Sequence, residues 1–242
     1  MAATAGRGER LPSTEDFLTP MHKGLRAMIY DLAGRLQVTD FTDPLGTERV
    51  VGDLRHELGG RVPTACIVCL LHTHTGHEDV WLFPALEPRE TGPVGRLRRD
   101  HAEIEARVRS VARRGEELTR LTSAEERRRT GRTLLHEAND LFATYLDHLN
   151  REEAVLVPLM NERLTDAQIV ALRISLERAL APERRAELYR WMLRSLDANE
   201  LAEWFRDLRL AAPPEMLATM VRWAGSEVEP ARWAVARARA GL

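Results

Sequence analysis

Apolar residues recur at intervals of three and four positions along almost the whole chain of 242 residues. This spacing places them on one face of a helix, whereas the alternation typical of strands is absent. It predicts four long helices, over residues 17–37, 47–86, 94–121 and 124–163, with Ser123 as the N-cap of the fourth. Pro63 lies within the second span and should kink or break that helix. Because the connections are short, we expect an all-α fold in which these helices form an up-down-up-down four-helix bundle.

The chain changes character after the fourth predicted helix. Four of the five Trp lie in residues 164–242, where Pro182, Pro213 and Pro230 divide the pattern into short amphipathic helices. We therefore expect three parts: a flexible N-terminus over residues 1–16, the bundle over 17–163 and a C-terminal helical extension over 164–242. Trp spaced among Leu and Met usually marks a core, so the extension should pack on the bundle.

Each predicted bundle helix carries a histidine where the apolar pattern would place a leucine. These are His22, His74, His101 and His148, and the last three are followed four residues later by Glu78, Glu105 and Glu152. Residues four apart share one face of a helix. In an up-down bundle the starts of the first and third helices lie beside the ends of the second and fourth. All four histidines should therefore meet at one level of the interior.

Imidazoles and carboxylates are costly to bury unless they are paired, protonated or bound to a metal. A single core histidine is usually a hydrogen-bonded structural residue, but four at one level with carboxylates favour a metal site. Mixed nitrogen and oxygen ligands suit iron, manganese or zinc, and a carboxylate-bridged pair within a four-helix bundle suits two irons best. His77 and Tyr145 are candidates to contact the ligands from outside.

The same residues carry a family resemblance. Residues 17–163 resemble the hemerythrin-like, or HHE cation-binding, family of non-haem di-iron bundles. The matching pieces are His22 in MHKGLR, the eleven residues HTGHEDVWLFP from His74, His101 in DHAEIE, and HLNREEAVLVP from His148. By this resemblance the four histidines are terminal iron ligands, and Glu78 and Glu152 bridge two irons.

The sequence departs from the oxygen-carrying hemerythrins at two points. They have a second histidine one turn after that of the third helix, where this chain has Glu105, and a longer gap to an aspartate in the fourth helix. We expect Glu105 to reach the first iron and make it harder and more electron-rich. That change favours peroxide or oxygen chemistry, sensing or iron handling over reversible carriage.

Two hypotheses of different class follow. The first is a di-iron protein that binds or reacts with dioxygen, peroxide or nitric oxide, with catalase-like or peroxidatic chemistry favoured. The second is a module that senses oxygen, iron or redox state and signals through its C-terminal helices, the candidate surface for a protein partner. A purely structural helical protein is the third alternative, and it requires that the purified chain hold no metal.

Charge and hydropathy narrow the setting. There are 35 basic and 37 acidic residues, a formal net charge of −2, which argues against nucleic-acid binding through bulk basicity. No apolar run is long enough for a membrane span, and the N-terminus lacks the apolar stretch of a signal peptide. We expect a cytoplasmic protein. Lys23 is the only lysine, as in chains encoded by GC-rich genomes, which suggests a bacterial source.

Overall fold

The computed structural model describes residues 18–54, 67–86 and 92–242, and every regular element in these ranges is a helix. The all-α fold is thus confirmed. The first part comprises α2 (Thr19–Gln37), α3 (Pro44–Leu54), α4 (Ile67–His77), the π-helical turn η1 (Glu78–Leu82), α5 (Phe83–Leu86), α6 (Gly92–Arg120) and α7 (Ala124–Arg163). The second part comprises α8 (Asp166–Ala179), α9 (Pro182–Ser195), α10 (Ala198–Ala211), α11 (Pro214–Glu227) and α12 (Pro230–Ala240).

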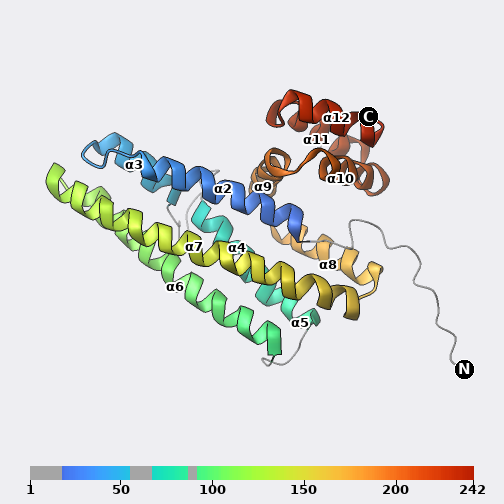
Figure 1. Ribbon diagram of the computed structural model, residues 1–242, viewed down its shortest axis with the longest axis horizontal. Coiled ribbons are helices and arrows are strands. Elements are labelled where there is room, and N and C mark those ends of the chain that lie inside the picture. Colours follow the sequence, from blue (N-terminus) through green and yellow to red (C-terminus); the bar gives the residue numbers. More distant parts are fainter. Residues whose placement is uncertain (1–17, 55–66, 87–91) are drawn as a thin grey trace, which may run out of the picture.

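The first part is a four-helix bundle. Helices α2, α6 and α7 lie side by side with the continuous segment α4–η1–α5, and α3 packs against α6 (Figure 1). The span predicted as one helix from 47 to 86 therefore consists of α3 followed by α4 to α5. The break expected at Pro63 lies outside the described residues.

Side-chain caps set where two of these helices begin. The carboxylate of Asp43 accepts hydrogen bonds from the backbone N–H groups of Leu45 (3.1 Å) and Gly46 (2.9 Å), so α3 starts at Pro44 and not at the expected residue 47. Asp before Pro is a favourable helix start because the cap satisfies free N–H groups and Pro needs none. Ser123 caps α7 as predicted, accepting from the N–H of Glu126 at 3.3 Å.

The η1 turn keeps one face of the second bundle helix directed at the core. The buried residues His74, Glu78, Leu82 and Leu86 are spaced by four. In an α-helix each such step drifts by about 40°, so three steps would carry the stripe about 120° around the helix. The wider π turn, whose hydrogen bonds span five residues, absorbs part of this drift.

The buried apolar residues form two clusters, one on each side of a polar layer. The larger cluster includes Leu25, Leu71, Ile104 and Leu149, and the smaller includes Leu18, Leu82, Leu97 and Leu156. In every bundle helix the histidine lies between a residue of one cluster and a residue of the other. The polar layer is therefore enclosed by apolar side chains above and below.

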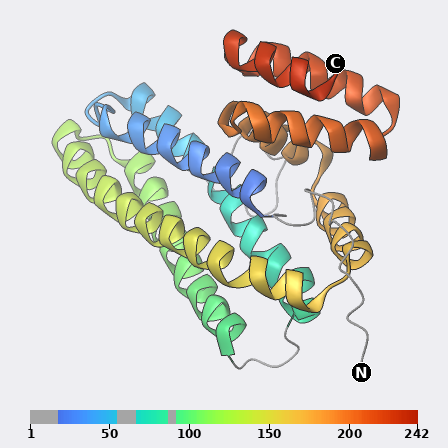
Figure 2. The same cartoon turned by 45° about the vertical axis from the view of Figure 1, so that its right-hand side comes forward.

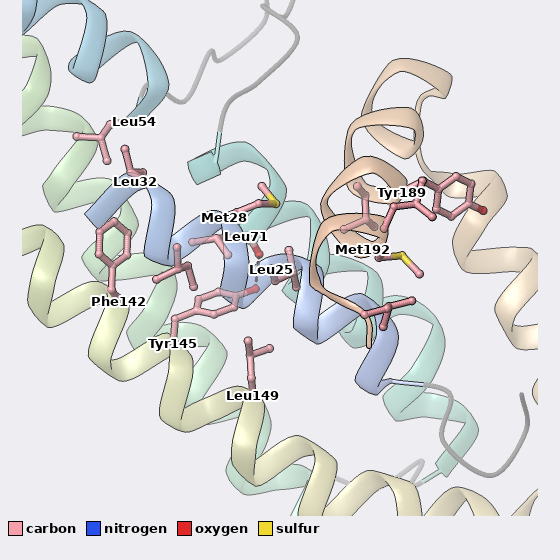
Figure 3. Close-up of a cluster of buried hydrophobic side chains, with 14 of the residues drawn as sticks. Leu25, Met28, Leu32, Leu54, Leu71, Phe142, Tyr145, Leu149, Tyr189 and Met192 are labelled. Atoms are coloured by element: carbon pink, nitrogen blue, oxygen red, sulfur yellow. Dashed lines mark hydrogen bonds between the residues drawn. The ribbon is translucent and has the colours of Figure 1, made fainter. Parts of the chain in front are cut away.

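The C-terminal helices pack on the bundle through α9 and α2 (Figure 2). Met192 and Tyr189 of α9 belong to the same buried cluster as Leu25 and Met28 of α2. Figure 3 shows the two α9 residues on one side of this contact and the two α2 residues on the other. Gly24 permits the close approach, since a Cβ there would lie 3.1 Å from the backbone nitrogen of Met192. The bundle and the extension thus share one core.

Within the described ranges, no helix combines the length and apolar character needed to cross a membrane.

Candidate metal centre

The polar layer brings together six side chains from all four bundle helices. Helix α2 supplies one histidine, α4 a histidine followed by the first residue of η1, α6 one histidine, and α7 a histidine and a glutamate. Each residue is 0 to 6% exposed: His22, His74, Glu78, His101, His148 and Glu152. The convergence expected from the sequence is therefore present.

The six residues divide into two sets with the same composition. One set is His22, His74, Glu78 and Glu152, and the other is His101, His148, Glu78 and Glu152. Within each set, one nitrogen or oxygen atom from every residue lies within 4.8 Å of the others. Both carboxylates belong to both sets, so the two sets adjoin each other.

Three of the four imidazoles, those of His22, His101 and His148, have Nε2 near the cluster carboxylates. Oε1 of Glu152 lies 2.8 Å from Nε2 of His148 and 3.3 Å from Nε2 of His101, and these two Nε2 atoms are 3.0 Å apart. Oε2 of Glu152 lies 3.7 Å from Nε2 of His22. Ring nitrogens and carboxylate oxygens from different helices thus face a common region.

The opposite ring nitrogens of His22 and His101 face carboxylates just outside the cluster. Nδ1 of His22 lies 3.0 Å from Oε1 of Glu153, which also accepts from Arg26 at 2.7 Å. Nδ1 of His101 lies 3.2 Å from Oδ2 of Asp79. A carboxylate at Nδ1 orients the ring and leaves Nε2 free for a metal.

His74 and His148 have outer partners too. Nδ1 of His74 lies 3.1 Å from the hydroxyl of Tyr145, which itself donates to the carbonyl of Leu71 at 3.1 Å. The hydroxyl has only one proton, so Nδ1 of His74 must carry the proton that they share. Nδ1 of His148 faces Oδ2 of Asp100 at 3.6 Å. His22, His101 and His148 thus each have a carboxylate near Nδ1, with Nε2 on the side of the cluster. In His74 the Nδ1 atom that contacts Tyr145 also lies 3.4 Å from Oε2 of Glu78.

Several inward-facing atoms find no hydrogen-bond partner among the described residues. They are Nε2 of His22 and His74, both carboxylate oxygens of Glu78, and Oε2 of Glu152. Buried polar atoms without partners are rare and require an explanation. Divalent cations held by imidazole and carboxylate supply that explanation, so the donor set fits a metal-binding site.

The electrostatics of the cluster also favour added positive charge. Burial and the neighbouring charge of Glu152 raise the pKa of Glu78 well above its usual value. Burial alone would lower the pKa of His101, but the carboxylates of Asp79, Glu152 and Glu78 outweigh it and raise that pKa to about 11. The buried carboxylates thus make the site attractive to cations.

Glu105, which we expected to reach the first metal, lies outside the cluster. Its side chain is 47% exposed and pairs with Arg109 at 2.5 Å. The reason is helical phase: after His101 the buried face of α6 continues at Ile104 and Val108, steps of three and four, so a residue four positions on turns outward. The expectation for Glu105 is corrected accordingly.

The remaining site residues lie around the cluster. His77 is half-buried and belongs to neither set of candidate ligands. Tyr145 contacts His74, as described above. No role was predicted for Asp79, Glu153 and Asp100. A signal was available for the first two, because each eleven-residue motif has a second acid directly after its glutamate, whereas Asp100 lies outside both motifs.

Comparison with known proteins agrees with this geometry. A family model described as the hemerythrin HHE cation-binding domain matches residues 14–160, well over half of the chain and all six clustered residues. Searches of curated proteins and of solved structures gave no match. The fold, the buried histidine and glutamate cluster and the extent of this match together show that the chain belongs to the hemerythrin HHE cation-binding domain family.

Proposed function

We propose that the cluster holds two iron ions bridged by Glu78 and Glu152, and that the protein reacts with small oxidants. Dioxygen, peroxide and nitric oxide are the candidate ligands, with peroxide-handling chemistry favoured. One observation carries the proposal: two sets of two histidines share the same two carboxylates. Bridging carboxylates between inward-facing residues of a four-helix bundle suit a pair of irons.

When bound, the irons would supply redox electrons and an open position for a small ligand. The chain itself orients and buries the ligands. Glu153 and Tyr145 contact Nδ1 of His22 and His74, and Asp79 and Asp100 place a carboxylate near Nδ1 of His101 and His148. The ring of Phe83 stacks on His101 with centroids 5.0 Å apart. Apolar layers pack on both sides of the cluster, and its six residues are 0 to 6% exposed.

The preference for redox chemistry over carriage now rests on the composition of the two sets and not on Glu105. Each set offers only two imidazoles, and both carboxylates are common to the two sets. Anionic oxygen ligands stabilise the ferric state more than neutral imidazoles do. A site of this composition should therefore autoxidise quickly after exposure to air.

The test compares two glutamate substitutions, one in the cluster and one outside it. Glu152→Ala should lose iron, near-ultraviolet charge-transfer absorption and gas evolution from added hydrogen peroxide. Glu105→Ala removes an exposed carboxylate from the adjacent helix and should retain all three. The unmodified chain, expressed in iron-rich medium, should contain about two irons. Stoichiometric zinc, or full iron content in Glu152→Ala, would contradict the proposal.

A second function is favoured by the contact between α2 and α9. Helix α2 carries His22 and also packs against Met192 of the extension. A movement of His22 on metal or ligand binding would therefore be transmitted through α2 to the extension. The chain could then sense oxygen, iron or redox state through the C-terminal helices. Protease sensitivity of residues 164–242 that changes with oxygen or iron, without peroxide turnover, would favour this sensor over the enzyme.

A further inference from the structure

A cavity of about 200 Å³ lies between the bundle and the C-terminal extension. Its inner end is formed by His74 and Glu78 of the cluster. Its outer wall comes from three helices of the extension and includes Leu176, Leu188, Met192 and Trp204. The extension therefore not only packs on α2 but also forms one side of a partly open cavity lined by the candidate metal ligands His74 and Glu78.

The volume indicates the size of ligand that this cavity can surround. An apolar cavity of about 150 Å³ lined by Leu, Ile and Phe is enough to bind benzene. About 200 Å³ thus admits one aromatic ring with a substituent of one or two atoms. The cavity is partly open, so a larger ligand would extend beyond it, whereas dioxygen, peroxide and nitric oxide need far less room. The cavity is larger than the proposed oxidants require.

Charged residues of both signs line the cavity. Helix α10 contributes Glu200, Glu203 and Asp207, while Arg173 and Arg185 come from α8 and α9. Glu200 is already engaged with Lys23 at 2.5 Å. Because acidic and basic side chains both line the cavity, their charges favour neither an anion nor a cation. The apolar walls favour a neutral molecule.

One polar group is available to such a molecule. His77 lines the cavity, is half-buried, and makes no hydrogen bond within the part of the chain that the structure describes. An imidazole can donate to or accept from a hydroxyl group. A ring carrying one hydroxyl would thus match both the apolar wall and this polar point.

We propose that the cavity binds a small neutral aromatic alcohol, with its ring against the leucine, methionine and tryptophan side chains of the extension and its hydroxyl at His77. The site depends on the cavity alone and not on which metal the cluster holds. The bound molecule would lie against His74 and Glu78, so this protein would accept an organic ligand next to its metal centre in addition to a small oxidant.

The experiment is calorimetric titration of the full chain, as purified, with benzyl alcohol. We expect one site per chain. Leu176→Trp places a larger side chain in the cavity from a half-buried position and should weaken binding at least tenfold. Leu210→Trp makes the same change at a residue that is 80% exposed on α10, and it should bind as the unmodified chain does. Leu180→Trp, at another half-buried position of the wall, replaces Leu176→Trp should that variant not fold.

The role of His77 is tested by comparing two ligands. The unmodified chain should prefer benzyl alcohol to toluene, and His77→Leu should remove that preference while toluene still binds. Absence of benzyl alcohol binding to folded protein, or equal binding by the cavity variant and Leu210→Trp, would refute the site. Preference for the linear octan-1-ol over benzyl alcohol would refute the aromatic ligand.

Discussion

The hydroxyl of Tyr145 is the most informative single group to remove. Tyr145 is completely buried, donates to the carbonyl of Leu71 and accepts from Nδ1 of His74, both at 3.1 Å. Burial, followed by the charges of Glu78 and Glu152, raises the pKa of the phenol well above its usual value, so it keeps its proton. Tyr145→Phe deletes one oxygen and preserves the packing of the ring.

The cost of this deletion falls mainly on His74. The carbonyl of Leu71 keeps a second side-chain donor, the hydroxyl of Thr75 at 3.4 Å, whereas Nδ1 of His74 loses its hydroxyl partner. Loss of one buried hydrogen bond costs about 0.5–1.5 kcal/mol of folding free energy, and Oε2 of Glu78 remains 3.4 Å from Nδ1 of His74. The freed ring can also adopt the tautomer with the proton on Nε2, and loss of such an outer contact lowers metal affinity by about 10–100-fold.

The assay measures metal retained per chain after dialysis against increasing chelator concentrations, together with thermal unfolding. Tyr145→Phe should release metal at chelator concentrations at least tenfold lower than the unmodified chain does. Tyr30→Phe, at a residue of α2 that is 60% exposed, is the matched control and should change neither property. If the two variants give the same retention curve, the hydroxyl does not orient His74 toward a metal.

Three further predictions concern the rest of the molecule. Chelation should lower the melting temperature by about 5–10 °C, as expected when a cation that stabilises the folded state is removed, and a melt that is unaffected by chelator would contradict this. Glu227 accepts from two arginines of α9, and although burial opposes its ionisation, these contacts lower its pKa below the usual 4.5. The ionised Glu227 carboxylate therefore stabilises the fold above pH 4.5, and this stabilisation disappears as the pH falls through the lowered pKa. Glu227→Gln should lower the free energy of unfolding by about 1–2 kcal/mol at pH 7, measured by urea unfolding, and the difference from the unmodified chain should become smaller in acid. A difference that does not depend on pH would show that the ionised carboxylate is not the stabilising group. Gly24→Val should destabilise the fold by about 1–3 kcal/mol because a Cβ there would already lie too close to Met192. Gly34→Val on the same helix is the control, since a Cβ at Gly34 meets nothing within 4 Å. Equal losses of stability in the two variants would mean that the contact with Met192 is unimportant.

Much of the bundle could be predicted because its signals are local. Helical spacing and the Ser123 cap placed the long helices within a few residues, and histidines at core positions identified the polar layer. The match of the motifs beginning at His74 and His148 identified the two glutamates shared by both sets of candidate ligands.

What could not be predicted depends on helical phase and on tertiary contacts. A step of four after His101 leads to Glu105 and a step of three to Ile104, and only the packing of α6 decides which of them is buried. The η1 turn leaves no clear mark in the sequence. The contact between His22 and Glu153 joins residues 131 positions apart, and the cavity between the bundle and the extension joins residues from both ends of the chain. Helical periodicity does not predict such contacts.

The η1 turn has a consequence for how this chain tolerates changes of length. A hydrogen-bond pattern that spans five residues in place of four is equivalent to a single-residue insertion in the second bundle helix. Deleting Val80 or Trp81, both exposed, would restore the regular pattern and rotate everything downstream by about 100° relative to everything upstream. His74 would keep its orientation while Leu82 and Leu86 turned away from the core. Homologous chains should therefore vary in length in the connections between helices and conserve the residue count from His74 to Leu86.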